Sequence, residues 1–532
     1  MADQALPFDV LLVVMEHSCP RTIAALMRTC RALYRDSTGP RLLLRNGATL
    51  ATDIDVLSFS AFMFASVPNG RFRHLRSLTV SKGGFSNDAV RMLASIVAHA
   101  ELRLDSLALI DAEGVLSSGS PIWTGDEQAP RSALFDAFSS LATLKHIKMT
   151  SIDERAHRLL DHLPHTLVSA DLAFDSPGAE WGALSDPETR NPIVRLGGSA
   201  DTLEELSGAG FDVRPDAIGY DVVYPRVRRI CASYKSGGAM PATAVYVHAF
   251  PGVESLALTA PRSLPWHDSG LTIMIERLEA RAVREANRDD QVNYGSWQHL
   301  RVVEGTAADV WALGLVCHVP ELRLHGDNTS SGFALGAGGL RDVLEDVRPE
   351  SLALTVAGSH VFGSDGPLSR VLREPVSQCL QALDVELVFQ PSEGDVEFAR
   401  LLEDIFETMA ALPLRFMKLT LNYGLIGGGY ERTPQPGSSR EYFCPLERLI
   451  VNTDLEKYAQ RFVNAIPSMD NAEVVRSRDR KPHEYMLGPV GRDSPVPGAA
   501  WSDDGSESAD REVMGELAEL GFGNAVDEDE GW

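Results

Sequence analysis

One pattern of apolar and polar positions returns along most of the chain. It consists of an apolar residue, two spacers, an apolar residue, one spacer and a last apolar residue, as in Leu75-Arg-Ser-Leu-Thr-Val80. The last two apolar positions are two residues apart, so on a β-strand both point to the same face, toward a core. The pattern therefore predicts a series of short strands, each entered through a turn that the first apolar residue anchors. The clear copies are Leu75–Val80, Leu104–Leu109, Leu144–Met149, Leu167–Leu172, Val253–Leu258, Val319–Leu324, Leu380–Val385, Phe416–Leu421 and Leu446–Val451; the looser ones are Leu203–Leu206, Val227–Ile230, Leu300–Val303 and Ser351–Val356.

Amphipathic segments lie between these predicted strands. Asn87–Val97, Asp395–Ala411 and Leu455–Ile466 carry apolar residues at helical spacing. Strands that alternate with helices and connect through right-handed crossovers stack into a parallel sheet. The sequence therefore predicts an α/β solenoid with a parallel sheet over residues 47–487.

This alternation resembles the leucine-rich repeat family in degenerate form. Neighbouring copies start from about twenty to nearly fifty residues apart, whereas the family's regular period is about 20–29 residues. The asparagine or cysteine of the standard repeat is missing from most copies. We expect the insertions Gly178–Ser199 and Pro261–Trp297 to form loops or extended helices on one rim. The alternative is an irregular α/β domain whose strands merely share a pattern.

The first 46 residues have a helical periodicity instead. Pro7 suits a first helical turn, because the N–H that it lacks would have no intrahelical partner there. Asp9 places a carboxylate near the positive end of that helix, and Cys19-Pro20 ends it. Apolar residues then form two stripes on more than one side of three short helices, which favours burial against a partner. The stripes are Leu6, Val10, Leu11, Val14 and Met15, and then Ile23, Leu26, Met27, Cys30, Leu33 and Tyr34.

The same stretch resembles the F-box, the three-helix module through which substrate receptors dock on the Skp-type adaptor of a cullin–RING ubiquitin ligase. The family's opening Leu-Pro, acidic residue and aliphatic run match Leu6, Pro7, Asp9 and Val10–Met15. The tryptophan that many members carry near the end is absent, since the chain has none before Trp123. The resemblance implies these adaptor-binding residues: Leu6, Pro7, Val10, Leu11, Val14, Met15, Leu26, Cys30 and Tyr34. The alternative is a helical cap that seals the end of the following domain.

Composition narrows the classes of partner. The 532 residues carry a net charge of −25, with 44% hydrophobic and 23% charged residues. The negative charge argues against a nucleic-acid partner, which requires a basic face. No apolar run is long enough to cross a bilayer, and six scattered cysteines show no metal-binding spacing. These features predict a cytoplasmic or nuclear protein with reduced thiols, no membrane and no metal.

Motifs for catalysis are weak or absent. Gly336-Ala-Gly-Gly-Leu-Arg341 lacks the third glycine of a dinucleotide-binding loop, and Gly427–Gly429 is not followed by the Lys-Ser/Thr of a P-loop. The chain contains neither a zinc-binding H-E-x-x-H nor a G-x-S-x-G nucleophile motif. The sequence therefore predicts a binding protein that is not an enzyme and uses no cofactor; a nucleotide-using enzyme built on the Gly336 region is the weaker alternative.

Residues 488–532 have the composition of a disordered acidic tail. They hold twelve Asp or Glu residues against two Arg, and prolines at 489, 495 and 497. Within them, residues 511–521 could form a short helix, and the Leu520-Gly-Phe522 ending is similar to the start of a ubiquitin-associated domain. Only ten residues follow Phe522, too few for the rest of that domain.

Together the resemblances imply a three-domain chain: an F-box at 1–46, a leucine-rich-repeat-like solenoid at 47–487 and the tail at 488–532. They imply a substrate receptor of an SCF-type ligase that binds a Skp-type adaptor, through it a cullin, and an unknown protein substrate. A non-catalytic repeat scaffold without a ligase role remains the alternative.

Overall fold

The computed structural model describes most of the chain up to residue 478. The described residues are 7–29, 33, 38–65, 70–81, 83–117, 125–174, 192–209, 222–233, 242–259, 270–325, 336–363, 366–426 and 444–478. The predicted tail at 488–532, with its helix at 511–521, lies outside them, and so do Leu6, Cys30 and Tyr34.

The described residues form one parallel sheet of fourteen strands that follow one another in chain order. The prediction of an α/β fold with a solenoid-like parallel sheet is therefore confirmed. The strands are β1 (Ala48–Leu50), β2 (Ser77–Val80), β3 (Ser106–Leu109), β4 (His146–Ile152), β5 (Ser169–Phe174), β6 (Glu205–Ala209), β7 (Arg229–Ser233), β8 (Ser255–Thr259), β9 (Val302–Thr306), β10 (Glu321–His325), β11 (Ser351–Ala357), β12 (Ala382–Val388), β13 (Phe416–Asn422) and β14 (Asn471–Ser477).

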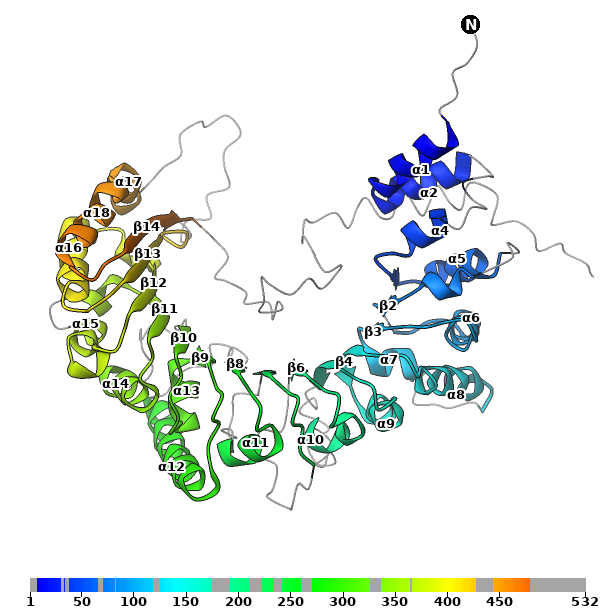
Figure 1. Ribbon diagram of the computed structural model, residues 1–532, viewed down its shortest axis with the longest axis horizontal. Coiled ribbons are helices and arrows are strands. Elements are labelled where there is room, and N and C mark those ends of the chain that lie inside the picture. The colour runs from blue at the N-terminus through cyan, green and yellow to red at the C-terminus, as the bar shows by residue number, and fades with distance from the viewer. Residues whose placement is uncertain are drawn as a thin grey trace, which may run out of the picture. The chain divides into compact units, whose positions relative to one another are not determined.

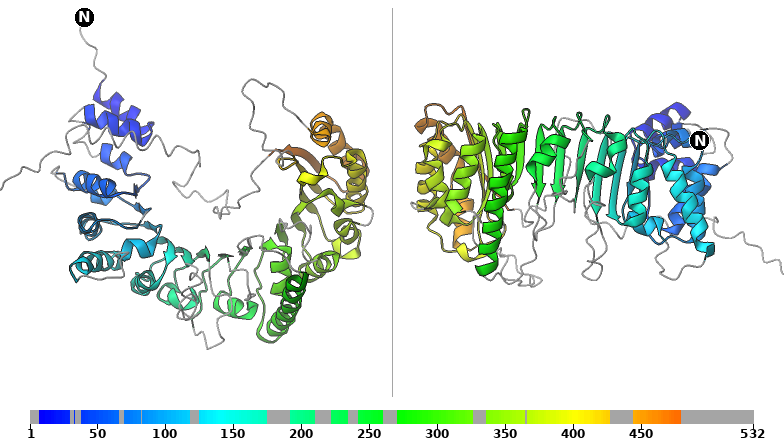
Figure 2. Two further views of the ribbon diagram at one scale, coloured as in Figure 1. Left: turned by 180° about the vertical axis from the view of Figure 1, so that it is seen from behind. Right: turned by 90° about the horizontal axis from the view of Figure 1, so that it is seen from below.

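Helices cover one face of this sheet, and the strands line the concave face (Figure 1). The two layers are also separate in the views of Figure 2. The longer helices of the layer are α5 (Asp53–Phe64), α6 (Asn87–Val97), α8 (Gly125–Ser139), α9 (Glu154–His162), α12 (Gly270–Tyr294), α14 (Gly336–Val347), α16 (Phe398–Met409), α17 (Pro445–Asn452) and α18 (Leu455–Ala465); the shorter ones are α7 (Ala112–Leu116), α10 (Pro192–Arg195), α11 (Thr243–Ala249), α13 (Ala307–Leu313) and α15 (Pro367–Leu372).

The repeated apolar positions build the core between the two layers. In β2, Leu78 and Val80 are fully buried, whereas Ser77 and Thr79 are half-buried on the concave side. Leu78 pairs with Leu107 of β3, and apolar residues continue the same row to Met417 and Ala472. The turns before the strands are also joined, because the carbonyl of Arg76 accepts from both the Asp105 and Ser106 N–H groups at 2.8 and 2.9 Å. The strands and helices of the array thus share one continuous core.

One predicted strand is wrong. Leu446–Val451 lies within helix α17, where Pro445 occupies the first turn and the Cys444 thiol accepts from the Glu447 N–H. The apolar residues buried there are Leu446 and Ile450, which are four apart, while Leu449 is 50% exposed. The spacing of four selects the helix, because a strand would bury alternate positions.

The two end strands, β1 and β14, were not predicted, and β13 begins in a different register from the one that the pattern indicates. Leu414, not Phe416, anchors the turn, since Leu414 is fully buried and Phe416 is 49% exposed. The last strand of the sheet is Asn471–Ser477 and not the predicted Leu446–Val451, and its buried apolar residue is Val474. The insertion Pro261–Trp297 does contain an extended helix, α12, but this helix packs in the helix layer beside α13 and not on a rim. Of the insertion Gly178–Ser199, residues 178–191 lie outside the described part.

In the described residues, three short helices precede the sheet: α1 (Phe8–Glu16), α2 (Pro20–Thr29) and α4 (Thr38–Leu43). They pack around a small core of their own, which is separate from the main one. Its buried members are Met15, Ile23, Met27 and Leu33. Phe62 of α5 packs against both cores, so it forms the junction between these helices and the array.

Candidate protein-docking surfaces

Helix α1 keeps most of its apolar side chains in solvent. Val13 is 55% exposed, and Phe8, Val10 and Val14 are exposed as well. Only Met15 of this helix is fully buried. The three helices therefore complete their own core and still present an aliphatic surface, which we call the α1 face: Val10, Val13 and Val14.

The described adaptor-binding candidates from the sequence fall into two groups. Pro7, Val10 and Val14 are exposed, so they are available to a partner. Leu11 and Leu26 are half-buried and, with Met15, belong to the small core. The inclusion of Met15 in the docking set needs correction, because its fully buried side chain holds the helices together and reaches no surface. Leu6, Cys30 and Tyr34 have no described position.

Helix α5 carries a second exposed apolar stripe that the sequence reasoning missed. Ile54 is 60% exposed, and Leu57 and Phe64 are also exposed. With Ala61 they occur at steps of three and four, so they share one side of the helix, while Val56 and Met63 are buried on another. This spacing was present in the sequence, but α5 is apolar on nearly all sides, and periodicity alone could not show which side faces the core.

A basic edge lies next to these helices. Burial lowers the pKa of His74, and the nearby charges of Arg73, Arg41 and Arg76 lower it further. The guanidinium carbon of Arg71 lies 4.3 Å from the centre of the Phe62 ring, at the junction of the two cores. Cations therefore gather here although the chain as a whole is acidic. A partner seated on this end would meet positive charge at its rim.

The concave face of the sheet is polar and its charges pair across neighbouring strands. Lys148 Nζ lies 3.0 Å from Asp171 Oδ2, and Arg229 Nη2 lies 2.7 Å from Glu205 Oε1. Each pair joins residues that are directly opposite in the sheet register. Such half-exposed pairs are mutually satisfied and are typical of a solvated surface.

Near its C-terminal end the concave face carries an exposed aromatic ring. Phe416 stands between the smaller Ala382 and Asn471 in the same row of the sheet. Beside it, Lys418 Nζ lies 3.8 Å from Asp384 Oδ2. Burial raises the pKa of Asp384. The positive charge of Lys418 lowers this pKa, and the negative charges of Glu386 and Glu473 raise it. We call Phe416, Lys418, Asp384 and Glu473 the Phe416 surface; a projecting aromatic ring flanked by charge is typical of a protein-binding anchor.

Among the described residues no group of three or more His, Cys, Asp or Glu side chains could hold a metal ion. Burial raises the pKa of the Cys231 thiol to about 12 and raises the pKa values of Cys317 and Cys379, which disfavours the reactive thiolate. Gly336–Leu340 forms the start of α14, and Gly427–Gly429 lies outside the described part. Nor does any helix in the described ranges have the length and apolarity to cross a membrane.

Comparison with known proteins adds no relative to this geometry. No protein-family model matches the chain, and no curated protein matches it.

Proposed function

We propose that this chain is the substrate receptor of an SCF-type cullin–RING ubiquitin ligase. Helices α1, α2 and α4 would act as an F-box that docks on a Skp-type adaptor, and the solenoid-like array would hold the target protein. The observation that carries the proposal is the α1 face, whose aliphatic side chains stay exposed although the three helices have a completed core and a junction to the array.

The separate core argues against a simple helical cap. A cap directs its apolar face into the array that it seals. Here Met15, Ile23 and Met27 pack with one another, and Phe62 is the residue that packs against both cores. Burying one large aliphatic side chain contributes roughly 1.5–3 kcal/mol. Four exposed apolar side chains on one short helix are therefore best explained by a partner surface that covers them.

In this proposal the protein performs no bond chemistry itself. Its contribution is positional, because it holds an acceptor lysine of the target near the ubiquitin-loaded enzyme and so raises the effective concentration of the two groups. A continuous sheet suits this role, since the row from Leu78 to Met417 joins both ends through one core. The Phe416 surface is the part of the concave face best suited to anchor the target. The acidic balance of the chain favours basic targets through steering.

Co-purification from cells tests the ligase assignment. The chain and its Leu6→Ala/Pro7→Ala variant are expressed with the same tag, and the recovery of the Skp-type adaptor and of a cullin is measured. We expect both partners with the unchanged chain and their loss with the variant. Equal recovery from the two would contradict the docking role of this segment.

A non-catalytic scaffold is the second candidate, because the Phe416 surface could bind a protein without any ligase. The two functions differ in their consequences for the bound target. A receptor shortens the target's half-life, so depletion of the chain should lengthen it, whereas depletion of a scaffold should leave it unchanged. Failure of any cullin to co-purify would also favour the scaffold.

The thiols fit a reducing compartment. Cys231, Cys317, Cys379 and Cys444, all in the described part of the chain, form no disulfide. We therefore place the proposed activity in the cytoplasm or nucleus, where a cullin-based ligase would act.

A further inference from the structure

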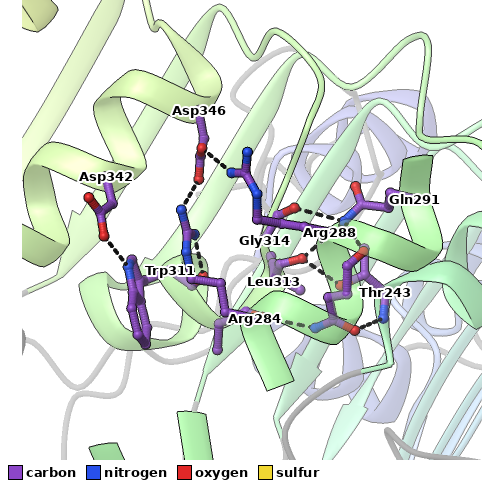
Figure 3. Close-up of polar contacts among 11 residues, drawn as sticks. Thr243, Arg284, Arg288, Gln291, Trp311, Leu313, Gly314, Asp342 and Asp346 are labelled. Carbon is purple, nitrogen blue, oxygen red and sulfur yellow. Dashed lines mark hydrogen bonds and ion pairs between the residues drawn. The ribbon is translucent and has the colours of Figure 1, made fainter. Parts of the chain in front are cut away.

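Helix α12 carries a stripe of polar residues that are buried in the helix layer. Arg284, Asn287 and Gln291 are each less than a tenth exposed. With Arg288 they follow steps of three and four, so they lie on one side of the helix. Figure 3 shows Arg284 and Arg288 directed at Asp346, and Gln291 directed at Leu313 and Gly314. Buried polar groups are costly unless they are paired, so their partners show what the stripe does.

The first partners of the stripe are the last backbone carbonyls of α13, which lack the N–H groups of a following helical turn. Arg284 Nη1 donates to the Trp311 carbonyl at 2.8 Å, and Asn287 Nδ2 donates to the Ala312 carbonyl at 2.8 Å. Gln291 Nε2 donates to the carbonyls of Leu313 and Gly314, at 3.2 and 2.9 Å. Side chains of α12 thus replace the missing turn of α13.

The second partner is Asp346 of α14, which receives two arginines. Arg284 Nη2 lies 2.5 Å from its Oδ2, and Arg288 pairs with its other oxygen. The Arg284 and Asp346 side chains are both 10% exposed. Trp311 Nε1 donates to Asp342 Oδ2 at 3.1 Å, next to this pair. Helices α12 and α14 are therefore joined by the ion pairs of Arg284 and Arg288 with Asp346, and Trp311 joins α13 to α14.

The network also reaches back across α12 to α11. The Thr243 N–H donates to Asn287 Oδ1 at 3.1 Å, and its hydroxyl donates to the Leu313 carbonyl at 2.8 Å. Residues that come from both sides of the insertion, α11 before it and α13 after it, are therefore tied to the same helix.

The sheet is narrow at the same place. Strands β8 and β9 share three residue pairs, Ser255–Val302 to Ala257–Glu304, whereas the adjoining pairs β7–β8 and β9–β10 share five each. Pairing as short as this, over three or four residues, recurs at the N-terminal strands β1 to β4. Beyond Glu304 comes Gly305, at which a Cβ would lie 3.1 Å from the Leu258 carbonyl oxygen. Backbone pairing therefore contributes less to holding the array together here than farther along.

From these two observations we infer that the β8–β9 contact is a bending joint of the array, and that α12 is the latch that holds it in one geometry. The latch consists of Arg284, Asn287, Arg288, Gln291 and Asp346. When it is intact, the strands before and after the insertion keep a fixed relation; when it is broken, the two parts move against each other. The inference does not depend on a ligase function.

Hydrogen exchange of the full chain tests the latch through Asp346→Asn. This change leaves Arg284 buried without a counter-charge, which strongly destabilises such sites. We expect amide exchange in α12, α13, β8 and β9 to accelerate about 100-fold, with β2–β5 and β11–β13 unchanged. Asp470→Asn is the matched control, because Asp470 pairs with Arg415 at 2.7 Å between neighbouring repeats but half in solvent. No acceleration at β8–β9, or equal acceleration throughout the sheet, would overturn the latch.

A distance measurement reports the bending itself. Spin labels at exposed positions 248 on α11 and 400 on α16 lie on opposite sides of the joint. We expect one narrow distance distribution for the otherwise unchanged chain and for Asp470→Asn, and a broadened one for Asp346→Asn. If the Asp346 variant does not fold, Gln291→Leu replaces it in both experiments, since it removes the donors to Leu313 and Gly314 but keeps every charge. A distribution that stays narrow in the variant used would refute the joint.

Discussion

Individual side chains of α1 divide into those that form the module and those that it presents. Met15 has no exposed surface, whereas Val13, two positions earlier, is mostly in solvent. Sequence periodicity placed Val10, Val14 and Met15 in one stripe, because Leu11 links them through steps of three and four. The structure separates them through packing with Ile23 and Met27 of α2, which periodicity within one helix cannot supply.

Alanine substitutions at Met15 and Val13 measure the difference between a buried and an exposed position of α1. Met15→Ala should lower the local stability of α1 and α2 by about 2–5 kcal/mol, because it leaves a cavity in a small core. Val13→Ala should change that stability by less than about 0.5 kcal/mol. Exchange protection of amides in α1 and α2 reports both values. Similar losses from the two substitutions would mean that α1 packs differently.

On the concave face, the carboxyl of Glu304 is coupled to a histidine. A hydrogen bond from His325, with a distance of 3.0 Å between His325 Nε2 and Glu304 Oε1, lowers the pKa of Glu304 below its usual value, although burial opposes this shift. A carboxyl whose pKa is lower in the folded state stabilises the fold above its unfolded pKa and loses that contribution as the pH falls through the folded value.

His325→Leu should therefore raise the pKa of Glu304. Titration of the Glu304 carboxyl by NMR measures this directly, and urea unfolding at a series of pH values should show the variant losing less stability than the unchanged chain between about pH 5 and pH 3. An unshifted carboxyl titration would show that the histidine does not interact with Glu304 in solution.

At the scale of whole elements, the repeated apolar pattern predicts strands well where each strand has neighbours on both sides. From β2 to β13 each predicted copy falls on a strand, because the buried row needs an apolar residue in every repeat. The end strands were harder to predict: β1 has three residues, and in β14 the one buried apolar side chain is Val474, which is still 9% exposed. An end strand has less to pack against, so its sequence carries less of the pattern.

Helix α17 shows that a sequence that matches the strand pattern can form a helix. Leu446, Leu449 and Val451 satisfy the strand pattern, but burial follows Leu446 and Ile450. The first turn decides between the two readings, because Pro445 begins the helix and Cys444 caps it.

Alanine substitutions in α17 distinguish the helix from the predicted strand. Leu446→Ala and Ile450→Ala should each destabilise the protein by about 2–5 kcal/mol, since both side chains are fully buried. Leu449→Ala and Val451→Ala should each cost less than about 0.5 kcal/mol. Denaturant unfolding gives these values. Large losses of stability at 449 and 451, with a small loss at 450, would indicate the predicted strand and not the helix.

For the whole molecule, the sequence was sufficient to predict the fold class but not to predict which side chains form the exposed surfaces. The sheet followed from local apolar spacing, which each repeat expresses separately. The α5 stripe, the Phe416 surface and the polar stripe of α12 depend on which side of an element faces its neighbours. That information lies between elements distant in the chain, as Arg284 and Asp346 illustrate.

The proposed function requires one partner at the N-terminal helices and another on the array. The α1 face, the α5 stripe and the basic edge near His74 lie at the N-terminal end of the array, whereas Phe416 lies on its second-last strand. The β8–β9 joint lies between these surfaces in the order of the strands, so the rigidity of the latch would set how the two bound partners are held relative to each other.

Affinity for a purified Skp-type adaptor tests the central claim most directly. Val10→Glu/Val14→Glu places two charges on the α1 face, and Leu449→Glu places one on an equally exposed apolar position of α17. We expect the adaptor to bind the unchanged chain and the Leu449 variant equally, and to bind the α1 variant at least about 100-fold more weakly, because two desolvated aliphatic contacts are lost. Adaptor binding that is absent from the unchanged chain, or unaffected by the α1 substitutions, would contradict the claim.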